Sequence, residues 1–184
     1  MVFQCKSKPP EMGAIFMLCV EQYKLFKNSL DFEKIYKESL TDLHKIYPNL
    51  EEFYQKYTSI CIHNKTIKLL YYNSEVIGYV LYSIKNRVLK FHFYYVSSKN
   101  RNRKHGRYFR LQIFKQLKDH VDILETGIDK TNFVALNAAK KTCSALNLNF
   151  ILKEINNPLF ICKQYSCEIR KNSLDNSHNV CDAS

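Results

Sequence analysis

The order of hydrophobic and polar positions along the chain predicts strands that alternate with amphipathic helices. An apolar run at 14–20 predicts a buried strand, and from Asp31 apolar residues recur every three to four positions, as they do on one face of a helix. Pro48 interrupts this pattern, and Asn49 is placed to cap a second helix. The N-terminal third is therefore expected to form one strand and two helices.

The middle of the chain has a shorter period. Three apolar runs at 66–72, 76–84 and 88–96 are separated by short polar turns, and they predict a meander of three antiparallel strands. Helical spacing then returns over 109–121, and residues 122–128 predict a further strand.

The C-terminal part continues the alternation with a helical stripe over 133–146 and two candidate strands at 148–155 and 159–164. This mixed order of elements predicts an α/β fold with helices packed on a sheet. We divide the chain into a leader at 1–11, a single domain at 12–165 and a polar, disordered tail at 166–184.

Composition narrows the class of protein. The chain has 184 residues, enough for one domain, and 46% of them are hydrophobic, which is enough for a core. Seven cysteines are irregularly spaced without a CxxC pair, so we expect reduced thiols in a cytoplasmic protein and no metal site. No run approaches the roughly 18 apolar residues that a membrane span needs.

Charge is concentrated in one segment. The formal net charge is +11, and six permanent cations fall within residues 96–110: Lys99, Arg101, Arg103, Lys104, Arg107 and Arg110. This segment, which also contains Gly106, joins a predicted strand to a predicted helix, and unpaired amides at a helix N-terminus favour anions. Its ligand is the phosphate of a small cofactor or the backbone of a nucleic acid; a solvated face is the third interpretation.

Several short motifs, taken in order, resemble the GCN5-related N-acetyltransferase (GNAT) superfamily. Residues 101–106 (RNRKHG) fall where the family has Q/R-x-x-G-x-G/A, between its fourth strand and third helix. Gly78 resembles the glycine of the family's hairpin, Asn132 and Ala135 resemble the N-x-x-A that starts its fourth helix, and 146–150 resembles the end of that helix. The resemblance covers roughly residues 12–165, and the chain departs from the motif at Lys104, where the family has glycine.

The resemblance implies the acyl-CoA N-acyltransferase fold, a mixed sheet of six to seven strands flanked by about four helices. It also implies acetyl-CoA as co-substrate and direct transfer of the acetyl group to a primary amine, with no acyl-enzyme intermediate. Strand backbone would hold the pantetheine arm, and the cationic turn would hold the phosphates. The residues expected to bind the cofactor are Tyr95, Val96, Ser98, Arg101, Asn102, Arg103, Lys104, His105, Gly106, Arg107 and Asn132.

Acyl transfer needs a base for the amine, and His92 is the natural candidate because histidine titrates near neutrality. Strand alternation places it on one face with Tyr94 and Val96. Glu125, on the next strand, is a second candidate that would act directly or through water. Packing or solvent exposure remains the alternative for both residues.

The acid that protonates the leaving thiolate is less defined. The family's helix tyrosine would fall at Ala139, so Cys143, one turn further on, is a candidate, although its place on the apolar stripe equally predicts core packing. Tyr94, Tyr95 or a water molecule are the other candidates.

The acceptor is open between small amines, aminoglycosides, protein N-termini and protein lysines. In this fold the two N-terminal helices would line its cleft, where carboxylates would orient a cationic amine; these are Asp31, Glu33, Glu51 and Glu52. Two rival interpretations remain. The first is a nucleic-acid-binding module, because aromatic and cationic residues interleave around 90–110. The second is a degenerate acyltransferase that binds CoA without catalysis.

Overall fold

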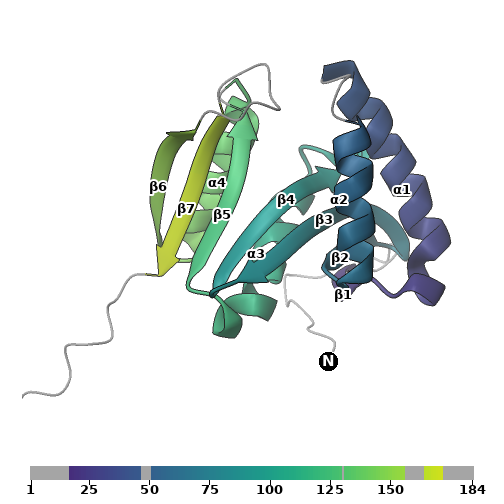
Figure 1. Cartoon of the computed structure of the whole chain (residues 1–184), viewed down its shortest axis with the longest axis horizontal. Helices are drawn as coiled ribbons and strands as arrows, with labels where there is room; N and C mark the ends of the chain where they lie inside the picture. The colour runs from purple at the N-terminus through teal and green to yellow at the C-terminus, as the bar shows by residue number, and fades with distance from the viewer. Residues whose placement is uncertain (1–16, 47–50, 130, 156–163, 172–184) are drawn as a thin grey trace, which may run out of the picture.

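The structure is a computed structural model that describes residues 17–46, 51–129, 131–155 and 164–171. Seven strands and four helices follow one another in these residues (Figure 1). In chain order they are β1 (Leu18–Gln22), α1 (Leu25–Ile46), α2 (Glu51–His63), β2 (Ile67–Tyr72), β3 (Glu75–Lys85), β4 (Val88–Val96), α3 (His105–Leu117), β5 (Ile123–Asp129), α4 (Phe133–Ala145), β6 (Leu148–Ile155) and β7 (Gln164–Lys171). The α/β class and the element order are as the sequence predicts.

One mixed sheet runs through the molecule in the order β1-β2-β3-β4-β5-β7-β6. Its strands pair antiparallel except for β4 and β5, which are parallel. Helices α1 and α2 cover one face of the sheet, and α3 and α4 cover the other (Figure 1). The chain crosses between β4 and β5 through the cationic turn and α3, which brings the turn to the end of β4.

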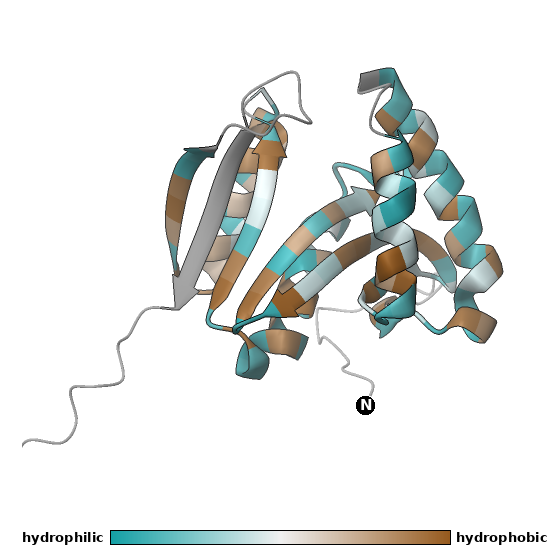
Figure 2. Cartoon of the chain, viewed as in Figure 1, coloured by the Kyte–Doolittle hydropathy of each residue, from teal (hydrophilic) through white to brown (hydrophobic). Residues whose placement is uncertain are grey.

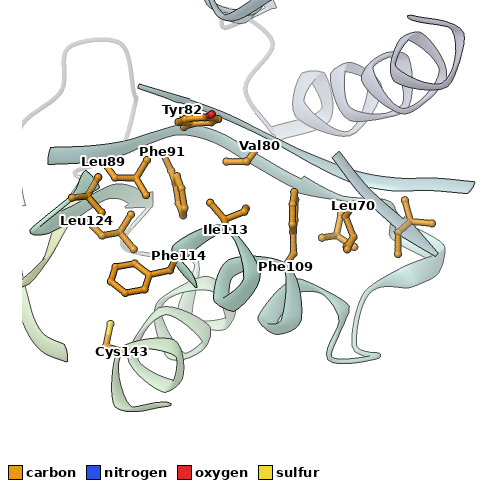
Figure 3. Close-up of a cluster of buried hydrophobic side chains, with 13 residues drawn as sticks. Leu70, Val80, Tyr82, Leu89, Phe91, Phe109, Ile113, Phe114, Leu124 and Cys143 are labelled. Atoms are coloured by element: carbon orange, nitrogen blue, oxygen red, sulfur yellow. The ribbon is translucent and has the colours of Figure 1, made fainter. Parts of the chain in front are cut away.

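Two hydrophobic clusters hold these layers together. On the α3 side, Phe109 and Ile113 are fully buried against Val80 and Phe91 of the sheet (Figure 3). On the other side, Phe32 of α1 belongs to the cluster that joins the two N-terminal helices to β2, β3 and β4. Hydrophobic and polar residues alternate along α1 and α2, as the colours of these helices in Figure 2 show. In α2 the buried residues are Tyr54, Thr58 and Cys61.

Three boundaries differ from the sequence prediction. Strand β1 ends at Gln22 rather than near residue 20, and α1 begins at Leu25 rather than at Asp31. The strand predicted at 159–164 lies mostly outside the described residues, and β7 occupies Gln164–Lys171 instead. The expectation of a disordered tail from 166 is therefore wrong for 166–171, because this segment pairs with both β5 and β6. Residues 172–184 and the leader at 1–11 lie outside the described part.

No helix in the described ranges combines the length and the apolar character that a membrane crossing requires.

Candidate active site between β4 and β5

The parallel strands β4 and β5 separate along their length. Their register runs from Val88↔Ile123 to Phe91↔Thr126 and stops there, after which β5 continues against β7 alone. Figure 1 shows the two strands close together at one end and apart at the other. The last five residues of β4 therefore have no strand partner on the β5 side among the described residues.

The backbone groups that face this opening follow from strand alternation. Ser97 N donates to Ile77 O at 2.8 Å, so Ser97 and Tyr95 turn their backbone groups towards β3, while Tyr94 and Val96 turn theirs to the opening. Val96 O accepts a hydrogen bond from Arg101 Nε at 3.0 Å. Binding of the cofactor by Val96 stays a prediction. The backbone groups of Tyr95 face β3 rather than the opening, and those of Tyr94 face the opening instead.

A cavity of about 230 Å³ lies in this opening. Its lining comes from both faces of the sheet, because residues of α1 and α2 on one side and of α3 and α4 on the other border the separation between the strands. The lining residues are Leu43, Tyr54, Phe91, His92, Phe93, Tyr94, Arg110, Leu124, Thr126, Gly127, Ile128, Asp129, Asn132, Ala135, Ala139 and Thr142. The cavity thus connects the two sides of the sheet at one point.

His92 lines the cavity, but on a different face from the one predicted. The register with β3 passes from Tyr82↔Phe91 to Leu81↔Phe93, so His92 is the extra residue of a β-bulge. The bulge places His92 with Phe93 and Tyr95 on the α1/α2 face, whereas Tyr94 and Val96 pack on the α3 face. The prediction that His92 shares a face with Tyr94 and Val96 is wrong, because strand alternation breaks at the bulge.

The environment of His92 suits a neutral base. Its Nε2 lies 2.8 Å from Ser83 Oγ, and its ring lies 4.9 Å from the ring of Tyr57. Burial, and then the charge of Lys90, lower the pKa of His92 below its ordinary value. The imidazole is therefore uncharged at neutral pH and able to accept a proton.

The cationic turn ends at the N-terminus of α3. Lys104 is the N-cap residue in a left-handed conformation with φ of 61°, and its side chain makes no capping hydrogen bond. The first bond into the helix is Tyr108 N to Lys104 O at 3.0 Å, so the preceding amides have no partner inside the helix. Asn102 is also left-handed, with φ of 64°. These exposed amides and the dipole of α3 favour an anion.

The six cations of the segment divide into two groups. Lys99 pairs with Glu75 at 2.7 Å, Arg101 pairs with Asp42 at 2.8 Å, and Arg110 lines the cavity. The other three, Arg103, Lys104 and Arg107, make no ion pair within the described ranges. They are exposed at the start of α3 and are the cations best placed to meet phosphate.

Two carboxylates of α1 fix the turn, and sequence reasoning did not find them. Glu38 accepts hydrogen bonds from Tyr95 Oη and from Ser98 N, each at 3.0 Å. Asp42 accepts hydrogen bonds from Tyr95 Oη at 2.9 Å and from Arg101 at 2.8 Å. Ser98 and Arg101, both predicted to bind cofactor, are thus engaged by α1.

The fold is similar to that of solved acetyltransferases. No protein-family model and no curated protein matches the chain. Among solved structures, the PaiA N-acetyltransferase of Thermoplasma acidophilum in complex with coenzyme A is similar with a TM-score of 0.62 and 13% identity over 84% of this chain and 99% of that one. Ard1 of Thermoplasma volcanium gives a TM-score of 0.63 at 13% identity, with the same coverage of both chains.

The chain has the GCN5-related N-acetyltransferase fold. A third similar structure is the diaminobutyrate acetyltransferase EctA of Paenibacillus lautus in complex with L-2,4-diaminobutyric acid and coenzyme A. It has a TM-score of 0.61 and 9% identity over 84% of this chain and 95% of that one. At such low identities the likeness is one of fold, and it confirms the fold that the sequence motifs predict.

Two turn residues, Gly106 and His105, have contacts with the sheet, and their expected roles at a phosphate stay predictions. A Cβ at Gly106 would point towards the sheet, 3.5 Å from Tyr94 Oη and 3.8 Å from the Val96 side chain. His105 is buried with its ring 4.8 Å from that of Tyr72. Its Nδ1 is buried without a hydrogen-bond partner in the described part of the chain.

Asn132 and Glu125 have structural partners. Asn132 Oδ1 caps α4 by accepting from Ala135 N at 3.0 Å, and the residue also lines the cavity. Glu125 does not line the cavity; its carboxylate lies 4.0 Å from Lys90 Nζ.

Cys143 belongs to the core. It is 1% exposed, its thiol donates to Ala139 O at 3.0 Å, and burial raises its pKa to about 11. Figure 3 shows it beneath Phe114, among the buried side chains of the α3 face. Its position supports core packing, the alternative that the sequence left open, and not an acid in the cavity.

Arg110 is the cavity residue that the sequence did not single out for chemistry. Its guanidinium carbon lies 4.9 Å from the ring centroid of Tyr94, and its Nε donates to Thr142 Oγ1 at 3.4 Å. Ala139, at the position of the family's tyrosine, also lines the cavity. The cation Arg110 therefore lines the same cavity as Ala139, the position at which the resemblance would place a tyrosine. The four carboxylates predicted to orient the amine (Asp31, Glu33, Glu51 and Glu52) are not in the lining.

Proposed function

We propose that the chain is an acetyl-CoA-dependent N-acetyltransferase that transfers an acetyl group to a primary amine by direct attack. The observation that carries the proposal is the coincidence of the β4–β5 opening, its cavity and an exposed cationic helix start at the end of β4. Coenzyme A has both an extended amide-bearing arm and phosphates, and these two features fit the opening and the turn.

The chain offers a group for each part of the cofactor. The backbone of Tyr94 and Val96 holds the pantetheine amides, as an added strand would. The amides at the start of α3, with Arg103, Lys104 and Arg107, hold the phosphates. The cofactor supplies an acetyl thioester at the cavity, where Asn132 and Ala135 at the start of α4 form the opposite wall.

His92 acts as the general base. In the tautomer whose Nε2–H donates to Ser83 Oγ, Nδ1 is left to take the proton of the amine. A carbon–nitrogen bond to the acetyl group forms as the carbon–sulfur bond breaks, and water protonates the thiolate. Arg110 stabilises the negative charge that develops on sulfur. Glu125 balances the charge of Lys90 beside His92 and is a positioning residue.

Calorimetric titration with acetyl-CoA and with dephospho-CoA, at two salt concentrations, tests the proposal. We expect micromolar binding of acetyl-CoA that weakens without the 3′-phosphate. Arg103→Ala and Arg107→Ala should each weaken it by about 10- to 150-fold, because a charge-assisted hydrogen bond contributes about 1.5–3 kcal/mol. Lys115→Ala, an exposed cation in the last turn of α3, is the matched control and should leave affinity unchanged.

Turnover separates the two CoA-binding interpretations. Release of free thiol with an amine panel would establish transfer, whereas CoA affinity without release on any amine would show the degenerate form that Ala139 keeps open. Absence of CoA binding even at low salt would overturn the proposal and direct attention to nucleic acid, whose binding falls steeply with salt.

A further inference from the structure

The wall of the cavity on the α1/α2 side has a distinct chemistry. It is formed by Leu43 of α1, Tyr54 of α2, and His92 and Phe93 of β4. Leu43 and Tyr54 are 8% and 7% exposed, and the rings of Tyr54 and Phe93 lie 4.6 Å apart. Helix α3, whose start carries the exposed cations Arg103, Lys104 and Arg107, covers the opposite face of the sheet. In the proposed reaction, the amine therefore approaches along the apolar wall.

None of the described residues that line this wall carries a carboxylate. The charged residues of the cavity lining are Arg110, on the other face of the sheet, and Asp129, at the end of β5. Asp129 Oδ1 already accepts from Thr131 N at 2.8 Å and from Thr131 Oγ1 at 2.7 Å. The charge that acts on His92 is the cation of Lys90. Beside the base, the Glu125 carboxylate already lies 4.0 Å from Lys90 Nζ, so an ammonium group would find no unpaired carboxylate in the lining of this wall.

An amine that must bind in its neutral form is available to the site only in its unprotonated fraction, and the pKa of the amine sets this fraction. Near pH 7.4 about a quarter of α-amino groups are neutral, against about one in a thousand lysine side chains, from ordinary pKa values of about 7.8 and 10.4. This roughly 300-fold difference in the neutral fraction disfavours lysine at a site whose lining offers no unpaired carboxylate. The apolar wall then selects the group attached to the amine-bearing carbon.

Resting on the proposed acetyl transfer, we propose that the acceptor is an α-amine on a carbon that carries a large apolar side chain. The side chain packs against Leu43, Tyr54 and Phe93, and the amine faces His92. A peptide N-terminus and an amino-acid amide both have this chemistry.

Initial rates of thiol release with acetyl-CoA test the proposal on five acceptors. These are tetrapeptides that begin with Leu, Phe or Asp, the amide of leucine, and the amide of Nα-acetyl-lysine. We expect kcat/KM for the Leu and Phe peptides to exceed that for the Asp peptide by about 10- to 100-fold, the range for burial of one such side chain. The lysine derivative should be slower still. Comparison of kcat/KM for leucine amide with that for the Leu peptide distinguishes an amino-acid amide from a peptide N-terminus as the acceptor.

Variants of Leu43 link the preference to this wall. Leu43→Asp introduces a carboxylate beside the amine and should raise the rate on the lysine derivative relative to the Leu peptide at least tenfold. Leu30→Asp, the same change at an 81% exposed position of α1, is the matched control. Unchanged acetyl-CoA affinity checks the fold of each variant. If Leu43→Asp does not fold, Leu43→Ala should reduce the Leu-over-Asp preference instead.

The outcomes distinguish a wrong acceptor from the absence of acetyl transfer. Turnover that favours the lysine or Asp acceptor, or a preference unaltered by Leu43→Ala, would overturn the acceptor assignment and leave acetyl transfer intact. Thiol release on none of the five acceptors, with CoA bound, would overturn the acceptor assignment, and the wider amine panel would then decide on transfer itself.

Discussion

Replacement of Gly78 by alanine should destabilise the protein through a backbone collision in the middle of the sheet. A Cβ at this position would lie 2.7 Å from Tyr95 O and 3.4 Å from Val96 Cα, and neither atom belongs to a flexible side chain. Strands β3 and β4 would have to move apart locally. Overpacking of this kind costs about 1–3 kcal/mol, which for a chain of this size lowers Tm by about 2–10 °C.

The matched control is Gly106→Ala, the same change in the cationic turn. Its new methyl would make ordinary contacts at 3.5 and 3.8 Å, and alanine is the better helix former in the first turn of α3. We expect its unfolding free energy to stay within about 0.5 kcal/mol of the parent or to rise.

Urea unfolding of both variants, followed by circular dichroism, measures the difference. Gly78→Ala should also weaken acetyl-CoA binding, because Gly78 pairs with Val96 at the β4–β5 opening. Equal stability of Gly78→Ala and the parent would refute the close approach of β3 and β4. A large loss of stability in Gly106→Ala would show instead that the turn is tighter than its contacts indicate.

Further predictions concern the site. His92→Gln should lower kcat about 100-fold or more without changing acetyl-CoA affinity. Because the pKa of His92 is lowered and its neutral form is active, the acid limb of kcat/KM should lie below pH 6.5, and Lys90→Met should move it upward. Cys143→Ala should cost about 1–2 kcal/mol of stability while turnover stays at the parent level; a loss of turnover would restore Cys143 as an acid. Asp42→Asn should weaken acetyl-CoA binding only while Arg101 is present, which a double-mutant cycle with Arg101→Ala measures.

Local pattern predicted most of the fold, since helical spacing and short apolar runs fall where the structure has helices and strands. The errors have tertiary causes. In β4, apolar residues alternate at Phe91, Phe93 and Tyr95, so a regular strand would place these three on one face. The register with β3 inserts His92 as a bulge instead, and Phe91 packs on the α3 face. Nothing in the sequence of β4 predicts the bulge, because the bulge depends on how β4 pairs with β3.

Strand β7 was missed for a related reason. Its sequence alternates Tyr165, Cys167 and Ile169 with polar residues, which is the signal that could have revealed it, but the polar composition after Ser166 dominated the interpretation. The segment becomes a strand because β5 and β6 offer it hydrogen bonds on both sides. Glu38 and Asp42 were missed because their role depends on the packing of α1 beside the turn, more than 50 residues away in sequence.

The distribution of partners among the six cations bears on the choice between a cofactor and a nucleic acid. Lys99 and Arg101 are held by carboxylates of β3 and α1, and Arg110 lies in the cavity, so half of the charge is committed within the fold. The remaining cations lie within five residues around one helix start. A cluster this compact matches the few phosphates of one small molecule, whereas a nucleic acid presents charge about every 1.7 Å along a duplex and favours an extended stripe of cations. Charge placement, more than net charge, therefore favours the cofactor.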